Sequence, residues 1–354
     1  MKIVVAIDSF KGSASSHELN ACVKETVNQF FPSVEVKAVA IADGGEGTIS
    51  ALREALGGEM RTVRTVDLLA RPIEASYLKV EQCAFIESAS VVGIDKITPS
   101  AKTFEKATSY GLGKLIHDAV KQGCKEIYVT LGGSGTSDGG LGLLQSFGFD
   151  GTTLQFSYPQ GWGDVKLFGL TDVKNVYAGE HGFAQMFGRQ KGGNEAQLLA
   201  RDQEAMDFAR WVYDESAIDI QGIPGTGAAG GLGAAIVLLG GHLESGFNQV
   251  ARIVGLENAI VNASLVITGE GRLDGQSKEG KVPYGVARLA QKHGVPVIAI
   301  SGSIADDVDW IWDEFLAVFS IQTQVLSLEE AMNPERTLSN LKFVMKNILR
   351  LFVR

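Results

Sequence analysis

The sequence predicts a two-domain α/β protein in which both chain ends build one parallel-sheet domain and the middle of the chain builds an inserted second domain. A length of 354 residues fits two domains of ordinary size. Patterns of buried strands and helices alternate at both ends of the chain, which is typical of an open parallel sheet. The middle instead alternates apolar and polar residues over short segments, which indicates antiparallel strands.

The N-terminal elements follow the order strand, helix, strand, helix. Lys2–Ile7 is a continuous apolar run, as expected of a parallel strand that is covered on both faces. A capping box at Ser15 begins a helix that Pro32 ends. Residues 34–41 predict a second strand, and residues 49–56 predict a second helix.

The middle of the chain has a different pattern. Residues 61–95 favour antiparallel strands, and residues 104–122 favour a helix before a strand at Ile127–Leu131. Residues 150–195 are rich in glycine and aromatic residues and are expected to be irregular. Residues 196–215 are expected to be helical.

The strand and helix order of the N-terminus returns at the C-terminus. Strands are expected at Ser264–Thr268, Val295–Ile300 and Phe315–Ile321, with a helix over residues 282–293. A last amphipathic helix is expected over Pro334–Leu351.

These changes of pattern set the predicted domain boundaries. Residues 1–60 and 264–354 form the parallel-sheet domain, and residues 61–263 form the inserted domain. The chain crosses between the domains twice, which predicts a cleft. Closure of such a cleft around bound substrates would exclude water.

Composition excludes several classes of function. The net charge is −9 and no lysine- or arginine-rich stripe is present, which argues against nucleic acid as a partner. Cys22, Cys83 and Cys124 lack the spacing of a metal site and fit small buried side chains in a reducing compartment. No uncharged apolar stretch reaches 18 residues, so we expect a cytoplasmic protein without a membrane span.

Five polar, glycine-rich segments mark the candidate functional loops. They cover residues 8–13, 43–48, 132–140, 224–233 and 269–277, the last of which is followed by Lys281. In an open α/β sheet, ligands bind at the carboxyl ends of the strands, where helix N-termini also favour phosphate. These loops therefore predict an anion-binding site.

The first two loops each allow two interpretations. Lys11 supplies a positive charge for an anion, although the loop also fits an ordinary solvated turn. Asp43 and Glu46 are spaced to hold Mg²⁺ or to accept substrate hydroxyls, but they also fit a helix start with a capping box.

The next two loops resemble phosphate cradles but match no standard motif. Residues 132–140 lack the Walker A pattern and the GxGxxG fingerprint with its acidic partner. Residues 224–233 fit either a site for the phosphates of a nucleotide or close helix packing.

The last loop carries the most charge. Asp274 is placed to act as a general base or a metal ligand. Arg272 and Lys281 are placed to hold a carboxylate or a phosphate. The histidines show no spacing typical of a metal site. His181 lies in a polar loop and is the one histidine that stays a candidate for a functional role.

Taken together, the motifs resemble the bacterial glycerate kinase family. The matching segments are MKIVVAIDSFKGS, ADGGEGT, FIESAS, TSYGLG, LGGSGTSDGG, FGRQKG, PGTGAAGGLGAA and ITGEGRLDGQSKEGKVPYGVA, in family order over nearly the whole chain. The resemblance implies an enzyme that uses ATP and Mg²⁺ to phosphorylate D-glycerate to 2- or 3-phosphoglycerate. It also implies a flavodoxin-like domain from both chain ends and an inserted mixed-sheet α/β domain.

For this reaction we expect a division of roles among the loops. The catalytic candidates are Asp172 or Asp274 as the base, with Lys11 and Lys191 offsetting phosphoryl charge. The substrate-binding candidates are Asp8, Ser9, Ser277, Lys281 and Arg272, which would hold the glycerate carboxylate. The ATP-binding candidates are Gly132, Gly133, Ser134, Gly225, Gly227, Gly230 and Gly231. The metal candidates are Asp43, Glu46 and Asp138.

Two other interpretations stay open. A nicotinamide-dependent dehydrogenase would suit the Rossmann-like N-terminus, but GxGxxG is missing. A non-catalytic regulatory protein that binds glycerate would suit the run Thr171–Val176, where Lys174 enters and the usual proline is lost. The expected partners are glycerate and ATP, without nucleic acid or membrane, and a homodimer is compatible with the sequence.

Overall fold

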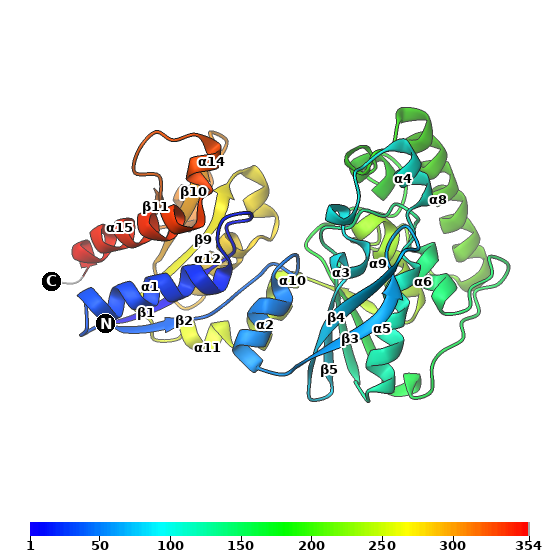
Figure 1. Ribbon diagram of the computed structural model, residues 1–354, viewed down its shortest axis with the longest axis horizontal. Helices are drawn as coiled ribbons and strands as arrows, with labels where there is room; N and C mark the ends of the chain where they lie inside the picture. Colours follow the sequence, from blue (N-terminus) through cyan, green and yellow to red (C-terminus); the bar gives the residue numbers. More distant parts are fainter. Residues whose placement is uncertain (353–354) are drawn as a thin grey trace. The chain divides into compact units, whose positions relative to one another are not determined.

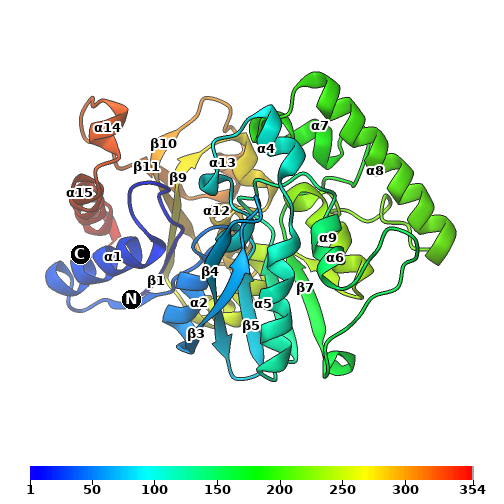
Figure 2. The ribbon, with the colours of Figure 1, turned by 45° about the vertical axis from the view of Figure 1, so that its right-hand side comes forward.

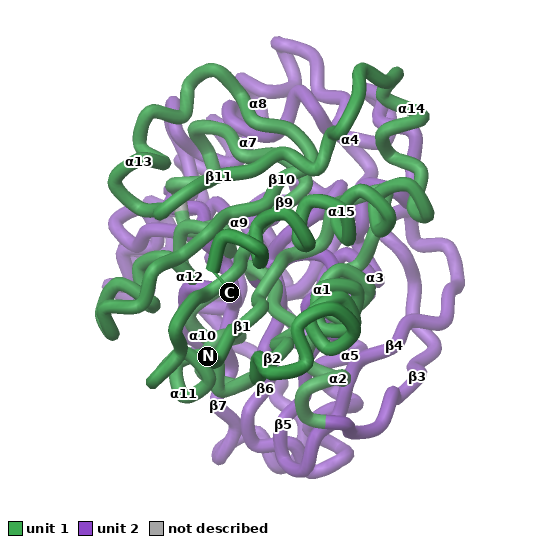
Figure 3. The backbone as a smooth tube through the Cα atoms, turned by 90° about the vertical axis from the view of Figure 1, so that its left-hand side faces the viewer, with its two compact units in different colours: residues 1–43, 50–56, 247–354 green, residues 44–49, 57–246 purple. Residues whose placement is uncertain are grey.

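The computed structural model describes residues 1–352, which divide into two compact units (Figures 1 and 3). Unit 1 comprises residues 1–43, 50–56 and the chain from 247 onward, and unit 2 comprises residues 44–49 and 57–246. Both chain ends therefore build unit 1. The domain boundaries that the sequence analysis sets after residues 60 and 263 stay a prediction.

Unit 1 contains a five-stranded parallel sheet with the strand order β11-β10-β9-β1-β2. Its strands are β1 (Lys2–Ile7), β2 (Glu35–Ala38), β9 (Leu265–Leu273), β10 (Val297–Ile304) and β11 (Ala317–Ser320). Its helices are α1 (Ser16–Phe30), α2 (Thr48–Leu56), α10 (Gly246–Ile253), α11 (Leu256–Ile260), η4 (Gly275–Glu279), α12 (Val282–Gln291), α13 (Ile311–Glu314), α14 (Leu328–Ala331) and α15 (Pro334–Phe352). This sheet confirms the predicted parallel arrangement.

The core of unit 1 forms around the strand β1. Residues 3–7 of this strand are fully buried, as the uninterrupted apolar run predicts. Helices α1 and α15 lie side by side in unit 1 (Figure 1). Val5 of β1, Leu19 of α1 and Leu341 of α15 are buried in one apolar cluster, so the two chain ends share a single core.

Unit 2 contains a six-stranded mixed sheet with the strand order β3-β4-β5-β6-β7-β8. The β3–β4 and β4–β5 pairs are antiparallel, and the remaining pairs are parallel. Its strands are β3 (Glu59–Val66), β4 (Pro72–Val80), β5 (Cys83–Glu87), β6 (Glu126–Thr130), β7 (Lys166–Leu170) and β8 (His242–Glu244). This sheet confirms the inserted mixed-sheet α/β arrangement.

The helices of unit 2 lie between these strands in the chain, and Figure 2 shows α5 alongside the sheet. They are α3 (Ala89–Val92), η1 (Ile94–Lys96), α4 (Ala101–Lys106), α5 (Tyr110–Lys121), α6 (Leu141–Ser146), η2 (Trp162–Asp164), α7 (Phe183–Phe187), η3 (Arg189–Lys191), α8 (Glu195–Ser216) and α9 (Ala228–Leu238). None of the helices within residues 1–352 combines the length and apolar character needed to cross a bilayer.

Two details of the sequence prediction for unit 2 are wrong. The single helix over residues 104–122 is two helices, because the backbone of Ala107 is extended (φ −65°, ψ 129°) and ends the first of them. Ser109, at the start of the second, donates hydrogen bonds to Asp138. The segment 150–195 is not irregular throughout, since it contains β7 and α7. Strand β7 is short and includes Gly169, so its own sequence gives little sign of a strand.

Candidate functional site

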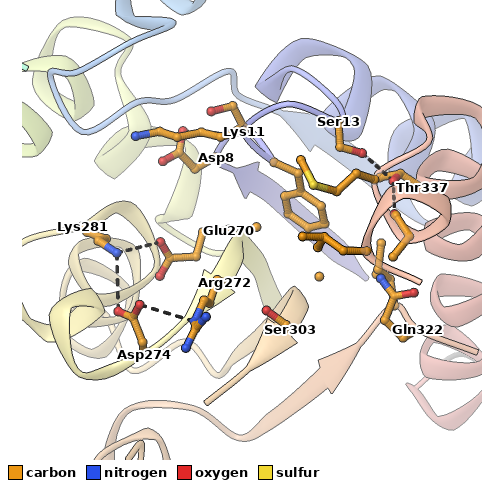
Figure 4. Close-up of a pocket in the computed structure, with 18 of the residues that line it drawn as sticks. Asp8, Lys11, Ser13, Glu270, Arg272, Asp274, Lys281, Ser303, Gln322 and Thr337 are labelled. Carbon is orange, nitrogen blue, oxygen red and sulfur yellow. Dashed lines mark hydrogen bonds and ion pairs between the residues drawn. The ribbon is translucent and has the colours of Figure 1, made fainter. Parts of the chain in front are cut away.

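A pocket of about 550 Å³ lies in unit 1 at the carboxyl ends of the parallel strands (Figure 4). It takes residues from the ends of β9 and β10 and from the segments that follow β1, β2, β9 and β11. Its lining includes seven of the predicted site residues: Asp8, Ser9, Lys11, Asp43, Arg272, Asp274 and Lys281. This is where an open α/β sheet ordinarily binds its ligands.

The loop after β1 is held at its base by buried hydrogen bonds. The Asn20 side chain accepts a hydrogen bond from the Ile7 amide (3.0 Å) and donates one to the Ile7 carbonyl (2.9 Å). Ser16 Oγ donates to the same carbonyl (2.6 Å). Asp8 is the next residue in the chain. These hydrogen bonds from α1 therefore fix the end of β1, and with it the positions at which Asp8 and Lys11 enter the pocket.

The end of β9 and the segment that follows it carry a chain of opposite charges. Lys281 Nζ lies 3.6 Å from a carboxylate oxygen of Glu270 and 3.6 Å from one of Asp274. Arg272 Nε lies 3.7 Å from the other oxygen of Asp274 (Figure 4). The two cations are therefore held beside the pocket by carboxylates of the same segment.

Ser277 does not line the pocket but forms a hydrogen bond that holds Asp274 in place. Its side chain is fully buried, and its Oγ accepts a hydrogen bond from the Asp274 amide (3.1 Å). The Asp274 side chain in turn accepts from the Gln276 amide. The predicted role of Ser277 in binding substrate stays a prediction, while its visible contact positions Asp274.

The pocket gathers more negative charge than its walls neutralise. Burial, and then the carboxylates of Asp43 and Glu270, raise the pKa of Asp8 well above its ordinary value. Burial also raises the pKa of Glu270, whose Oε1 has no hydrogen-bond partner among the described residues. Such unbalanced carboxylates are typical of sites that receive a cation or a proton.

The two glycine-rich loops of unit 2 pack against each other. The Gly139 amide donates to the Gly230 carbonyl (2.9 Å). A Cβ atom at Gly230 would lie 2.0 Å from the Thr136 carbonyl oxygen, and one at Gly231 would lie 2.5 Å from Gly139. Close backbone packing therefore accounts for these two glycines, and the binding of ATP by residues 132–134 and 225–231 stays a prediction.

Asp138 is a buried structural acceptor in the same loop. Its carboxylate accepts hydrogen bonds from the amide and hydroxyl of Ser109 (2.7 and 2.8 Å) and from the amides of Gly140 and Gly142 (3.2 and 3.1 Å). These bonds join the loop to the start of α5. Its predicted role in holding Mg²⁺ is untested.

Lys191 lies beneath the first of these loops. It is 3% exposed, and its Nζ donates to Ser134 Oγ (3.0 Å) and to the Thr136 carbonyl (2.7 Å). Burial lowers the pKa of Lys191 to about 7, although Asp138 acts in the opposite direction. The hydroxyl of Ser137 is also buried, without a hydrogen-bond partner among the described residues.

The other predicted residues of unit 2 are placed separately. Asp172 accepts a hydrogen bond from Ser245 Oγ (2.8 Å), and Glu46 is exposed. The backbone carbonyl of His181 accepts a hydrogen bond from the Asn175 side chain (3.0 Å), and a role for the His181 ring stays a prediction. Among the side chains that the structure describes, no three acidic, histidine or cysteine groups lie closely enough together to hold a metal by themselves.

The structure also adds pocket residues that the sequence analysis does not single out. They come from the end of β10, from the segment between β11 and α15 and from the start of α15: Gly302, Ser303, Ile321, Gln322, Leu326, Leu328, Ala331, Met332 and Thr337. Most are ordinary apolar or polar residues without a motif. Their position follows from the parallel sheet, in which the carboxyl end of β11 lies on the same side of the sheet as the carboxyl end of β1.

Comparisons with known proteins agree over almost the whole chain. A model of the Glycerate kinase family matches residues 3–155 and 154–353. Glycerate 2-kinase of Escherichia coli (strain K12) is 36% identical, over 94% of this chain and 93% of its own. Glycerate kinase of Halalkalibacterium halodurans is 34% identical, over 93% of each chain.

A solved structure shows the same fold. The crystal structure of a putative glycerate kinase 2 from Salmonella typhimurium LT2 superposes with a TM-score of 0.85 at 32% identity. The match covers 99% of this chain and 98% of that chain.

Proposed function

The chain belongs to the glycerate kinase family, and we propose that it transfers the γ-phosphoryl group of ATP to a hydroxyl of D-glycerate, using the charged pocket of unit 1. A kinase of this kind is a phosphotransferase with an alcohol group as acceptor. The product would be 2- or 3-phosphoglycerate.

The observation that carries the proposal is the set of cations around the pocket. Lys11, Arg272 and Lys281 all line it. Phosphoryl transfer needs little covalent chemistry from the protein, because positioning and charge neutralisation supply most of the catalysis. Lys11 and Lys281 would offset the charge of the phosphates, and Arg272 would hold a carboxylate or phosphate through paired hydrogen bonds.

The carboxylates of the same pocket fit Mg²⁺. Burial, followed by repulsion from Asp43 and Glu270, raises the pKa of Asp8, and Glu270 Oε1 lacks a hydrogen-bond partner among the described side chains. Mg²⁺ is usually held by one or two carboxylates together with water and substrate phosphates, so a set of three close ligands is not required. When bound, the ion would neutralise charge on the phosphates of ATP.

We propose two carboxylates as the candidate base that accepts the proton of the glycerate hydroxyl. Asp274 lines the unit 1 pocket beside Arg272 and Lys281, and Asp172 lies in unit 2 next to Ser245. Lys191 of unit 2 is proposed to offset phosphoryl charge. A group that accepts the proton in the transition state contributes about 10²–10⁴-fold to the rate.

The reaction is tested by ADP release in a coupled assay, with D-glycerate and MgATP. We expect release only when D-glycerate is present, and phosphorus and carbon NMR of the product will identify the hydroxyl that carries the phosphate. Glycerate binding without ADP release would contradict the proposal and favour a regulatory protein.

The role of Asp274 is tested by Asp274→Asn, which keeps the shape of the side chain but removes its charge. We expect kcat to fall by at least about 10²-fold, because the variant loses a base and the partner of two cations. Asp313→Asn is the matched control, since Asp313 is exposed and does not line the pocket. Wild-type turnover by Asp274→Asn would exclude the role.

A further inference from the structure

We propose that the apolar end of the unit 1 pocket binds the adenine base of ATP and that the Gln322 side chain recognises the edge of that base. This inference rests on the proposed function, because it presupposes that ATP is the donor. It places the nucleoside in unit 1, and not at the glycine-rich loops of unit 2 that the sequence favours.

The pocket lining has two chemically different parts. The charged residues Asp8, Lys11, Glu270, Arg272, Asp274 and Lys281 come from the loop after β1, from the end of β9 and from the chain between β9 and α12. The apolar residues Ile321, Leu326, Leu328, Ala331 and Met332 come from the segment between β11 and α15, which we call the apolar end of the pocket. Figure 4 shows Gln322 and Thr337 on the side of the pocket opposite Lys281 and Asp274. A nucleoside triphosphate has the same division, with an apolar aromatic base at one end and phosphates at the other.

The size of the pocket fits a nucleotide better than glycerate alone. A volume of about 550 Å³ lies within the range of sites for cofactors and drug-sized ligands. Glycerate is a three-carbon acid and would fill only a small part of it. Polar glycerate would also leave the apolar end without a matching ligand.

The apolar end keeps hydrophobic side chains accessible to solvent. Leu328 is 75% exposed and Met332 is 37% exposed. Met332 also packs over the loop after β1, because a Cβ atom at Gly12 would lie 2.7 Å from its terminal methyl carbon. Covering accessible apolar surface with a planar base would be favourable.

Gln322 supplies polar recognition at this end. Its Oε1 is buried and has no hydrogen-bond partner in the described part of the chain. An amide side chain offers both a donor and an acceptor, which matches the ring nitrogen and amino group on the edge of adenine. A polar group that is left unpaired when the wrong base binds gives strong discrimination.

The sheet order agrees with this orientation. The strand order changes direction between β1 and β9, where the charged residues Asp8 and Glu270 lie at the carboxyl ends of the two strands. Phosphates bind at such a switch point in open α/β sheets. Gln322 follows β11 at the edge of the sheet, so a nucleotide with its phosphates at the switch point would extend its base toward Gln322.

Binding of ADP to the full chain, measured by calorimetry, tests the apolar end. We expect Leu326→Ala combined with Met332→Ala to weaken ADP binding by about tenfold or more, because apolar contact area is lost. KM for D-glycerate should change by less than about twofold, because glycerate does not reach this end. The control Phe343→Ala removes an exposed apolar side chain of α15 outside the pocket and should leave ADP affinity unchanged. If the wild type binds ADP and the double variant binds it with the same affinity, the inference is overturned.

Gln322→Leu tests base recognition. We expect the ratio of kcat/KM for ATP to that for GTP to fall by about tenfold, and an unchanged ratio would exclude Gln322 as the recognition residue. A separate measurement needs no variant: photolabelling with 8-azido-ATP should mark residues 322–332. Labelling of residues 132–140 or 225–233 would overturn the inference while leaving the kinase function intact. No ADP binding and no turnover by the wild type would instead contradict the proposed function.

Discussion

The amine of Lys191 is almost wholly buried, so folding removes a normally charged group from water. Burial lowers the pKa of Lys191 to about 7, against about 10.4 in an unfolded chain. Between these values the unfolded chain binds more protons, so the contribution of Lys191 to the free energy of unfolding rises with pH. Below pH 7 both states are protonated and the burial penalty is complete.

Lys191→Met tests this at the level of one residue. The variant should gain stability relative to the wild type by a few kcal/mol more at pH 6 than at pH 10, because methionine has no proton to gain. Urea unfolding of both proteins at both pH values measures this change. The hydrogen bonds that the variant lacks are missing at both pH values, so their loss cancels when the two pH values are compared. Lys102→Met, at an exposed position, is the control. A difference that does not depend on pH would show that Lys191 is not neutralised by burial.

At the scale of elements, the path of β1 into the pocket depends on one buried amide. The Asn20 side chain is 1% exposed and bonds both the amide and the carbonyl of Ile7, at the last residue of β1. Asn20→Leu keeps the approximate size but leaves the Ile7 amide without its side-chain acceptor, while the Ile7 carbonyl keeps the hydrogen bond from Ser16 Oγ. We expect the free energy of unfolding to fall by about 1–3 kcal/mol, measured in urea.

Asn347→Leu is the matched control for that prediction. Asn347 is exposed, and its side chain donates one hydrogen bond to the Phe343 carbonyl on the same helix. Its replacement should change stability by less than about 0.5 kcal/mol. Equal losses for the two variants would mean that the buried bonds to Ile7 have no special value.

The elements also show what the sequence can and cannot predict. β1 is found at the predicted residues because its apolar run is long enough to identify a covered strand. β7 and β8 are not predicted, since they have five and three residues and are recognisable only through their partners in the sheet. Polar residues at or just after the ends of strong strands, such as Arg272 and Asp8, are therefore predicted well as pocket residues. Gln322 is not, because only the folded chain places it there.

At the scale of the whole molecule, each unit has its own apolar core. Leu341 belongs to the core of unit 1, and Leu115 belongs to the core of unit 2. Both side chains are fully buried. Separate cores allow each unit to unfold as a cooperative block of its own.

We therefore expect calorimetry to resolve two unfolding transitions, and two variants to assign them. Leu341→Ala and Leu115→Ala should each lower one transition, because truncating a buried leucine costs about 2–5 kcal/mol in the core that contains it. ADP should raise the transition that Leu341→Ala lowers, since a ligand stabilises the block that binds it. A single transition that both variants lower equally would show that the two cores unfold together, and a shift by ADP of the Leu115 transition alone would place the nucleotide in unit 2.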